Sequence, residues 1–341
     1  MLDAIIVGAG PIGIELAAAL KREGLSYAHL ERGCLAQTVF GYPPDTHFFS
    51  SPERIAIAGI PFLTPDQNKA KREEYLTYLR AVVTQLQLQI RFFENVESIV
   101  PGRNGGFTVQ SKHVRTGRES QYEARRIILA TGDMHKYRML GVPGEDLGHV
   151  SHSLKDPHTY LGQRVLIVGG KNSAAEAAIR LYRAGAQVSL SYRQRELPAD
   201  SIKYWILPEL NSLIKTGMIR FFPASTVKEI QAEQVILDSA GETVSVLADS
   251  ILLLTGYVLD PTLYTLCGIK TDPTTQQPEW NPETMETNVA GIFVAGTGAA
   301  GTQKPYRFFI ENCHEHVDRI VGAITGKPVT AFRKFFEMPE S

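Results

Sequence analysis

Two glycine-rich turns in this sequence have the composition and spacing of phosphate-binding loops. The first, Gly8-Ala9-Gly10-Pro11-Ile12-Gly13, lies between a predicted strand at residues 3–7 and a predicted helix at 11–22. Glycines at this spacing let the backbone approach a pyrophosphate, whose negative charge the helix N-terminus favours. Glu31 ends the next predicted strand, at the distance expected for an acid that binds ribose hydroxyls. The pattern predicts a dinucleotide site on Gly8, Gly10, Pro11, Ile12, Gly13 and Glu31. Both FAD and NAD satisfy it, and the alternative is a turn needed only for tight packing.

The second turn, at residues 169–174, lies between a predicted strand at 165–168 and a predicted helix at 173–184. Lys171 stands where the usual second glycine would be, and no acid ends the next strand, at 187–191. Arg193 and Arg195 follow that strand instead, and arginines pair well with a 2′-phosphate. The pattern favours NADPH over NADH, and the alternative is a solvated basic turn. The predicted NADPH residues are Gly169, Gly170, Lys171, Asn172, Ser173, Ala174, Tyr192, Arg193, Arg195 and Lys203.

Two later segments favour FAD over NAD in the first site. Ala130-Thr131-Gly132 follows a predicted strand at 126–129, and Gly296-Thr297 follows another at 291–295. They resemble the two C-terminal signatures of the thioredoxin reductase-like and glutathione reductase-like flavoproteins, although Thr297 replaces the acid that normally holds the ribityl chain. A helix beginning at Pro305 is expected to aim its N–H groups at the flavin. We expect four further residues to complete the FAD site, namely Arg32, Phe49, Ser50 and Val96.

The order of these elements predicts an α/β fold with two Rossmann-like dinucleotide-binding domains, the NADPH domain being inserted in the FAD domain. The expected boundaries are 1–135 for the first FAD segment, 136–256 for the NADPH domain and 257–341 for the second FAD segment. Other predicted elements are a loop-rich stretch at 34–67, a helix at 72–86, a strand at 90–93, a hairpin at 97–126, strands across 227–254 and a last helix at 305–324.

Composition narrows the class of partner. The formal net charge is −1 and no long run of one sign occurs, so neither nucleic acid nor an anionic membrane is expected as a partner. The first apolar run is too short for a signal peptide or a membrane span, which favours the cytosol. Cys34, Cys267 and Cys313 are widely spaced, so they are expected to be free thiols, with no metal site.

Several stretches are more specifically similar to the bacillithiol disulfide reductase family of NADPH-dependent flavoenzymes. They are Tyr42-Pro43, Phe48-Phe49-Ser50-Ser51, the turn at 169–174, Ser201-Ile202-Lys203, the stretch 205–209 and Phe309-Ile310-Glu311-Asn312. The resemblance implies a thioredoxin reductase-like architecture, FAD, NADPH and a low-molecular-weight disulfide as electron acceptor in the cytosol. It also implies a homodimer or homotetramer, and a domain rotation with hinges near residues 131–136 and 255–260.

Two departures concern the sulfur chemistry. The redox Cys-x-x-Cys of thioredoxin reductases would fall at residues 152–155, which are His-Ser-Leu-Lys, so no dithiol relay is expected there. In the bacillithiol disulfide reductases a cysteine thought to be active follows the proline of the first glycine turn, and Ile12 holds that position here. Cys34 and Cys313 are candidate substitutes, but free cysteines of small number are more often inert.

The remaining candidates would act beside the flavin, and the predicted chemistry is hydride transfer from NADPH followed by direct reduction of an acceptor. His47, Phe48 and Phe49 are candidates for the wall of the ring, with ordinary core packing as the alternative. The last helix offers His314 and His316 as proton donors to a leaving thiolate. Helical spacing puts these two on different faces, and a polar surface role is the alternative for both.

Two other functions stay open. A ferredoxin or flavodoxin NADP reductase of the same fold also lacks a redox dithiol and uses a protein redox partner, and one of Phe332, Phe335 and Phe336 would then stack on the flavin. A flavin-bearing or dinucleotide-sensing regulatory protein would bind the nucleotides without rapid turnover.

Overall fold

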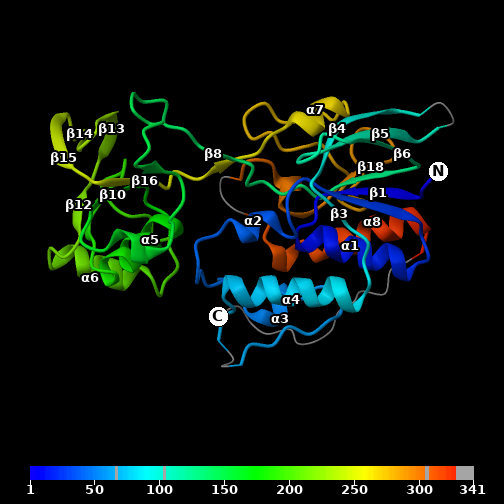
Figure 1. The fold of residues 1–341 in the computed structure, drawn as a ribbon, viewed down its shortest axis with the longest axis horizontal. Coiled ribbons are helices and arrows are strands. Elements are labelled where there is room, and N and C mark those ends of the chain that lie inside the picture. The colour runs from blue at the N-terminus through cyan, green and yellow to red at the C-terminus, as the bar shows by residue number, and fades with distance from the viewer. Residues whose placement is uncertain (66–67, 103–104, 304–306, 328–341) are drawn as a thin grey trace. The chain divides into compact units, whose positions relative to one another are not determined.

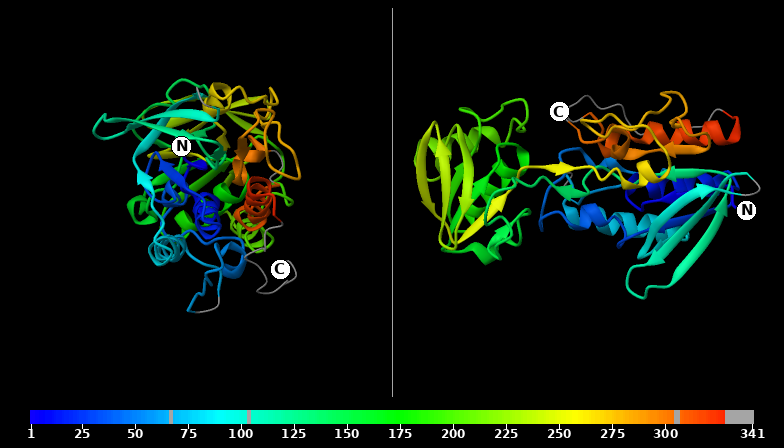
Figure 2. Two further views of the ribbon diagram at one scale, coloured as in Figure 1. Left: turned by 90° about the vertical axis from the view of Figure 1, so that its right-hand side faces the viewer. Right: turned by 90° about the horizontal axis from the view of Figure 1, so that it is seen from above.

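The computed structural model describes residues 1–65, 68–102, 105–303 and 307–327, which form two compact units (Figures 1 and 2). Unit 1 comprises residues 1–41, 45–136 and the described residues from 258 onward, and unit 2 comprises residues 42–44 and 137–257. The chain passes from one unit to the other along β8 (Lys136–Tyr137) and β17 (Tyr257–Val258), which pair as a two-stranded sheet.

The centre of unit 1 is a five-stranded sheet in the order β18-β7-β1-β2-β3, in which every pairing is parallel. Ile5 of β1 lies opposite Ala28 of β2 and Ile127 of β7. β1 and β7 are short, fully buried apolar runs, as is typical of parallel sheets covered on both faces. The bounds are Ala4–Val7 for β1, Tyr27–Glu31 for β2, Arg91–Phe92 for β3, Ile127–Leu129 for β7 and Ile292–Val294 for β18.

Helix α1 (Pro11–Arg22) packs against β1, β2 and α8 (His314–Thr325), and its alanines are buried because small side chains allow this close approach. The predicted loop-rich stretch also forms α2 (Gln37–Phe40) and α3 (Pro52–Ile55), each a single turn too short to predict from periodicity. The other helices of unit 1 are α4 (Arg72–Gln85), α7 (Thr262–Leu266) and the 3₁₀ turns η2 (Gly296–Ala300) and η3 (Ile310–Asn312).

Two predicted elements of unit 1 need correction. The expected hairpin is a three-stranded antiparallel sheet of β4 (Glu94–Pro101), β5 (Phe107–His113) and β6 (Glu119–Ala124), because a tight turn after β5 returns the chain for a second pairing. The last helix begins at His314, since Phe309 is extended and its N–H donates to Asn312 Oδ1, which leaves only the η3 turn before α8. Pro305 lies outside the described residues, as do Phe332, Phe335 and Phe336.

Unit 2 is built on a second parallel sheet, in the order β12-β11-β10-β16-β9. Its strands are β9 (Val150–Ser151), β10 (Arg164–Val168), β11 (Gln187–Ser191), β12 (Arg220–Phe222) and β16 (Ser250–Leu253). Helices α5 (Asn172–Arg183) and α6 (Leu207–Lys215) and the turn η1 (Pro157–Tyr160) accompany them. An antiparallel sheet of β13 (Ser225–Ile230), β14 (Gln234–Ser239) and β15 (Glu242–Leu247) packs its apolar residues on β10 and β16.

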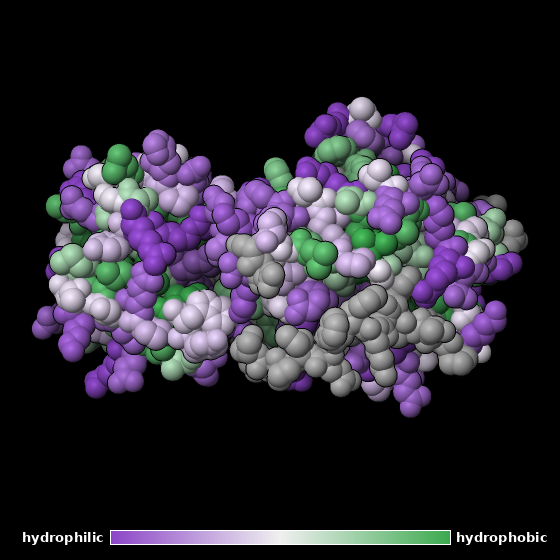
Figure 3. Space-filling model, turned by 90° about the horizontal axis from the view of Figure 1, so that it is seen from below, coloured by the Kyte–Doolittle hydropathy of each residue, from purple (hydrophilic) through white to green (hydrophobic). Residues whose placement is uncertain are grey.

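A helix among the described residues could cross a membrane only with the length and hydropathy that a membrane span requires. None of the helices in this part of the chain is both long enough and apolar enough to span a bilayer. On the face drawn in Figure 3, hydrophobic residues form small groups separated by hydrophilic ones.

Candidate functional site

The carboxyl edge of the unit 1 sheet brings the first set of predicted turns together. β1, β7 and β18 are neighbours in parallel register, and the glycine turn at 8–13, the turn at 130–132 and the turn at 296–297 each follow one of them. Parallel strands end at the same edge of a sheet, where open α/β folds bind their ligands. Segments more than 280 residues apart in the sequence, Gly8 and Gly296 among them, therefore lie at the same edge of the sheet.

The three glycines of the first turn are required for different structural reasons, or, for Gly10, by no packing contact at all. Gly8 has a φ of +104°, and a Cβ built on Gly13 would lie 2.0 Å from the carbonyl oxygen of Gly8. A Cβ on Gly10 would meet nothing within 4 Å, so no packing contact requires that glycine. Gly10 is the N-cap of α1, and no side chain of the described residues caps this helix end. The open space and the uncapped N–H groups fit a pyrophosphate at this position.

Glu31 ends β2 and holds the glycine turn from the side. Its Oε2 accepts a hydrogen bond from the N–H of Ala9 at 2.7 Å, and its Oε1 accepts one from the N–H of Gly33 at 2.7 Å. Each oxygen keeps a lone pair that can accept from a ribose hydroxyl. The neighbouring Arg32 is exposed.

Ile12 is 6% exposed and lies against the turn at 296–297. A Cβ on Gly296 would be 3.6 Å from Ile12 Cβ, so the two residues are in contact across the site. The Thr297 hydroxyl oxygen is 3.7 Å from the place of a Cβ on Gly132 and only partly buried. The position of the family's cysteine is thus an apolar contact in this chain.

Two buried side chains make hydrogen bonds next to the turns at 130–132 and 296–297, and neither was predicted from the sequence. The Tyr264 hydroxyl donates to the carbonyl of Gly298 at 3.0 Å, and Tyr264 is 2% exposed. Gln303 Nε2 donates to the buried carboxylate of Asp133 at 2.9 Å, while Gln303 Oε1 accepts from the N–H groups of Arg307 and Phe308. Both belong to segments without a sequence motif, so no local signal marks them.

A surface position for the histidines of α8 is wrong. His314 and His316 are 4% and 2% exposed, because α8 is covered by α1 on one side and by the Gly296 turn on the other. His316 Nδ1 accepts a hydrogen bond from the N–H of Gly296 at 3.1 Å. Burial, together with the charge of Arg319, lowers the pKa of His316 to about 4. A neutral His316 therefore holds the turn that follows β18.

His314 has both ring nitrogens engaged. Nδ1 lies 2.6 Å from Glu15 Oε2 on α1, and Nε2 donates to the carbonyl of Arg54 in α3 at 2.9 Å. Glu15 Oε1 also accepts from the N–H of Ala58. The contact ties three segments together inside unit 1, and a histidine held in this way is poorly placed to protonate a bound substrate.

The cysteines offered as substitutes are in unfavourable settings for a thiolate. Cys313 is fully buried, and burial together with the charges of Asp133 and Glu15 raises its pKa. Cys34 is half-buried, and burial raises its pKa as well. Thiolate chemistry needs the opposite shift.

The other candidates beside the flavin differ in burial. His47 is exposed and pairs with Lys71 in an isolated bridge. Phe48 packs edge-on against Tyr75 with ring centroids 4.7 Å apart, in a cluster of aromatic residues. This contact is the core packing that was the alternative for Phe48. Phe49 and Ser50 are half-buried, and Val96 is buried on β4.

The carboxyl edge of the unit 2 sheet holds the second set of predicted turns. The turn at 169–174 joins β10 to α5, with the exposed Lys171 as N-cap in an extended conformation. Tyr192, directly after β11, lays its ring over this turn, so that a Cβ on Gly170 would be 2.2 Å from it. Arg193 and Arg195 are exposed, and neither has an ion-pair partner among the described residues. The N–H of Lys203 donates to Asn172 Oδ1 at 2.8 Å.

Residues 152–155 follow β9 in unit 2 and contain no sulfur. The His152 ring stacks on Tyr137 with centroids 5.1 Å apart, and its Nε2 lies 4.0 Å from a buried Glu145 oxygen. The expected absence of a dithiol is a property of the sequence, and these contacts give the segment a packing role.

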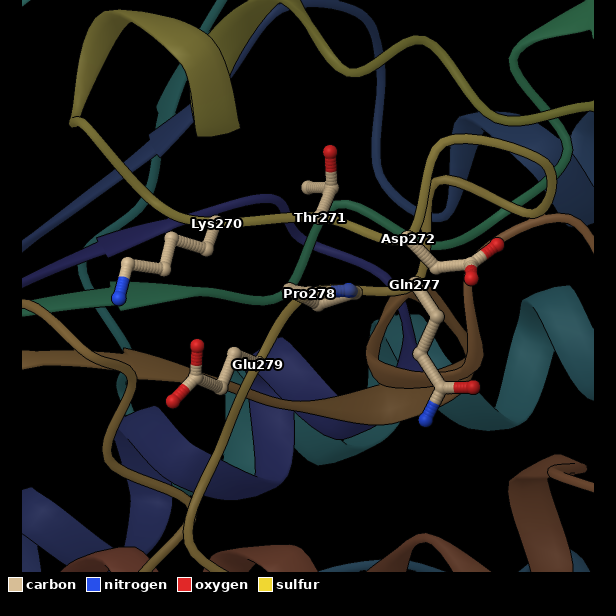
Figure 4. A pocket seen from close by; sticks show the side chains of 6 residues that line it. All are labelled: Lys270, Thr271, Asp272, Gln277, Pro278 and Glu279. Carbon is tan, nitrogen blue, oxygen red and sulfur yellow. The ribbon is translucent and has the colours of Figure 1, made fainter.

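A surface pocket of about 350 Å³ lies elsewhere in unit 1, where Thr271 and Pro278 pair in an isolated bridge (Figure 4). The charged side chains that line it are Lys270, Asp272 and Glu279. None of them belongs to the predicted nucleotide sites. Among the described residues, no group of histidine, cysteine or acidic side chains could hold a metal ion.

Comparisons with known proteins identify the family of this chain. Residues 5–296 match the family model of the pyridine nucleotide-disulphide oxidoreductases. The chain is 36% identical over 322 residues to the bacilliredoxin reductase of Bacillus subtilis, covering 94% of this chain and 97% of the relative. It is 27% identical to the ferredoxin–NADP reductase of Ignicoccus hospitalis, covering 87% and 90%.

Solved structures give the same result. The bacillithiol disulfide reductase of Bacillus cereus matches with a TM-score of 0.90 and 34% identity over 95% of this chain and 99% of that one. The thioredoxin reductase of T. acidophilum, at 20% identity, shares the fold with a TM-score of 0.72 over 95% and 98%. The predicted α/β fold with two Rossmann-like sheets and a thioredoxin reductase-like architecture is confirmed.

Proposed function

This chain belongs to the bacillithiol disulfide reductase family within the pyridine nucleotide-disulphide oxidoreductases, and from that membership we propose that it carries electrons from NADPH through FAD to a low-molecular-weight disulfide. That it is a flavin- and pyridine nucleotide-dependent oxidoreductase of the thioredoxin reductase-like class follows from the family. The choice of NADPH, the residues of each site and the acceptor are the proposal.

In the proposed arrangement, unit 1 binds FAD. The uncapped N-terminus of α1 beside Gly10 would take the pyrophosphate, and Glu31 would accept from the ribose hydroxyls. The turns at 130–132 and 296–297 would line the rest of the cofactor, with Ile12 and Thr297 between them. When bound, FAD supplies the chemistry of accepting a hydride from the nicotinamide and passing both electrons on.

Unit 2 binds NADPH in this proposal, and the observation that carries the choice is the charge after β11. Arg193 and Arg195 are exposed at the carboxyl edge, where a carboxylate such as Glu31 stands in unit 1. Guanidinium groups favour a 2′-phosphate, which an acid at this place would repel. Lys171 adds positive charge at the N-terminus of α5.

The acceptor is proposed to meet the flavin directly, in the overall reaction NADPH + H⁺ + RS–SR → NADP⁺ + 2 RSH. Three observations support this choice: the apolar Ile12, the absence of sulfur from residues 152–155, and the raised pKa of Cys34 and Cys313. The names of two relatives offer two acceptors, a bacillithiol disulfide and the protein bacilliredoxin. We propose the small disulfide. The proposed setting is the cytosol, with self-association as a homodimer or homotetramer.

An anaerobic titration of the holoprotein tests the function. NADPH should bleach the visible flavin band at once, and adding bacillithiol disulfide should restore it. Restoration by bacilliredoxin but not by the disulfide would overturn the acceptor, and restoration in single-electron steps by ferredoxin would favour the ferredoxin reductase. A flavin that stays oxidised in excess NADPH would favour the sensing role.

The choice of NADPH has its own test in the paired change of Arg193 and Arg195 to alanine. We expect NADPH binding to lose about 2 to 4 kcal/mol of free energy, which raises its Kd roughly 30- to 1,000-fold. The Kd of NADH should change little. Arg220→Ala is the matched control, because this exposed arginine starts β12 at the opposite edge of the sheet. Equal weakening of both cofactors would contradict the assignment.

A further inference from the structure

Two large aromatic side chains of unit 2 face solvent beside the proposed NADPH site. Tyr204 is 70% exposed and Trp205 is 37% exposed. Their rings meet edge to face, with centroids 4.9 Å apart and planes at 88°. Exposed Tyr and Trp side chains are common at binding surfaces because they offer a large, stiff contact area with a polar tip.

A hydrogen bond fixes this pair close to the glycine turn. The N–H of Lys203 donates to Asn172 Oδ1, and Asn172 is the first residue of α5. Tyr204 and Trp205 follow that anchor by one and two residues, so their backbone lies within about 8 Å of it. The Lys203 ammonium also lies 5.9 Å from the centroid of the Trp205 ring. The aromatic pair is therefore adjacent to the place proposed for the pyrophosphate.

The strand order says on which side of that place the pair lies. β11 and β12 are on one side of β10, and β16 and β9 are on the other. The segment that holds Arg193, Arg195, Tyr204 and Trp205 leaves β11 and leads through α6 to β12. In open α/β sheets the dinucleotide lies across the carboxyl edge, with its 2′-substituent beside the end of the second strand. The pair is thus on the adenosine side.

We propose that Tyr204 and Trp205 form an aromatic platform for the adenine of the nicotinamide dinucleotide. Because the two rings are perpendicular, the adenine stacks on the face of one ring while the other ring meets its edge. The proposal rests on the proposed function, in which unit 2 binds NADPH. Purine rings present a π-face that Trp and Tyr side chains bind by stacking. The platform supplies this contact, while Arg193, Arg195 and Lys203 supply charge for the phosphates. Unit 2 then recognises the adenosine half both by stacking and by charge.

The test uses the holoprotein and two probes that lack nicotinamide, adenosine 2′,5′-bisphosphate and ADP-ribose, with Kd measured by calorimetry. Trp205→Ala and Tyr204→Ala should each raise the Kd of both probes about tenfold. Trp205→Phe keeps an aromatic face and should stay within about twofold of the parent. Met218→Ala is the matched control, since Met218 is 51% exposed and follows the far end of α6.

The outcomes separate the platform from the function on which it rests. Unchanged Kd values for both probes overturn the platform. If the Kd of NADPH rises while those of the two probes do not, the aromatic pair contacts the nicotinamide half instead. If the Kd of NADPH is also unchanged, the pair is better explained as a contact for a protein partner. If the parent protein binds ADP-ribose and shows no preference for adenosine 2′,5′-bisphosphate, the assignment of NADPH is wrong. The Kd of ADP-ribose then still tests the platform. Should Trp205→Ala fail to fold, the more exposed Tyr204→Ala decides.

Discussion

The two units build the same strand, glycine turn and helix with different residues at matching positions. In unit 1 the second and third key positions of the turn are Gly10 and Gly13, whereas in unit 2 they are Lys171 and Ala174. A Cβ at position 13 would lie 2.0 Å from a backbone carbonyl, yet Ala174 carries a Cβ at the same helical position. The third glycine is therefore a packing requirement in unit 1, and unit 2 does not share it.

The residues after the second strand differ in charge. Glu31 accepts two backbone hydrogen bonds beside the first turn, while the exposed Arg193 and Arg195 follow β11 in unit 2. The same strand, turn and helix arrangement thus carries a negative side chain after its second strand in unit 1 and positive side chains there in unit 2. In the proposed function, this difference separates a ribose with free hydroxyls from one that carries a 2′-phosphate.

The largest expected effect comes from filling the close contact in unit 1. Gly13→Ala places a methyl group against the Gly8 carbonyl, and backbone on both sides cannot yield easily. We expect the free energy of unfolding of unit 1 to fall by about 3 kcal/mol or more. The chain has two tryptophans, Trp280 in unit 1 and Trp205 in unit 2, so fluorescence in a Trp205→Phe background reports the urea unfolding of unit 1.

Gly10→Ala is the control for that change. Its Cβ meets nothing within 4 Å and its φ is −75°, so the apoprotein should keep its stability while the methyl group obstructs FAD. Helix propensity favours alanine over glycine, so it cannot account for a loss in either variant. Equal loss of stability in both variants would therefore contradict the contrast between close contact at Gly13 and open space at Gly10.

Acid should weaken unit 1 through its buried histidines. Burial lowers the pKa of His29 and of His316 to about 4, well below the ordinary histidine value of about 6.5. Between pH 6.5 and pH 4 each of these histidines is protonated in the unfolded chain but neutral in the folded unit. The free energy of unfolding therefore falls, as the pH falls, by up to about 1.4 kcal/mol per pH unit for each histidine. Asp318 opposes this trend, because burial and the charge of Glu15 raise its pKa to about 6.

Variants isolate the histidine contribution. His316→Asn keeps an acceptor for the Gly296 N–H, and His29→Gln keeps a donor for the Gly8 carbonyl. The difference in unfolding free energy between parent and variant should grow in favour of the variant as pH falls from 6.5 to 4. A difference that stays constant over this range would mean that the histidine is protonated in the folded unit.

The glycine turns and their strands could be predicted from the sequence because their signals are local. Spacing within six residues, an apolar run before and a helical pattern after are enough to place 8–13 and 169–174 on the sheet edges. The family resemblance could be recognised for the same reason, since its motifs are continuous in the sequence.

What the sequence did not reveal depends on contacts between distant segments. His314 meets Glu15 across 299 positions, and Gln303 meets Asp133 across 170. Helical spacing puts the α8 histidines on different faces, but it cannot say that two other segments cover both faces of the helix, so a polar surface role stood as the alternative for both. The cap on the Gly170 turn by the Tyr192 ring is another such contact.

The smallest expected effect sharpens the comparison from the side of unit 2. Ala174→Gly gives α5 the glycine that α1 requires, but no close contact is relieved, since the helix already accommodates a Cβ there. Only the helix propensity changes, so the free energy of unfolding of unit 2 should fall by about 1 kcal/mol. Trp205 fluorescence in a Trp280→Phe background measures it, and the unit 1 transition, followed by Trp280 in a Trp205→Phe background, serves as the control. A rise in the free energy of unfolding of unit 2 would mean that the Ala174 methyl group strains the parent. Both units would then require a glycine at this position.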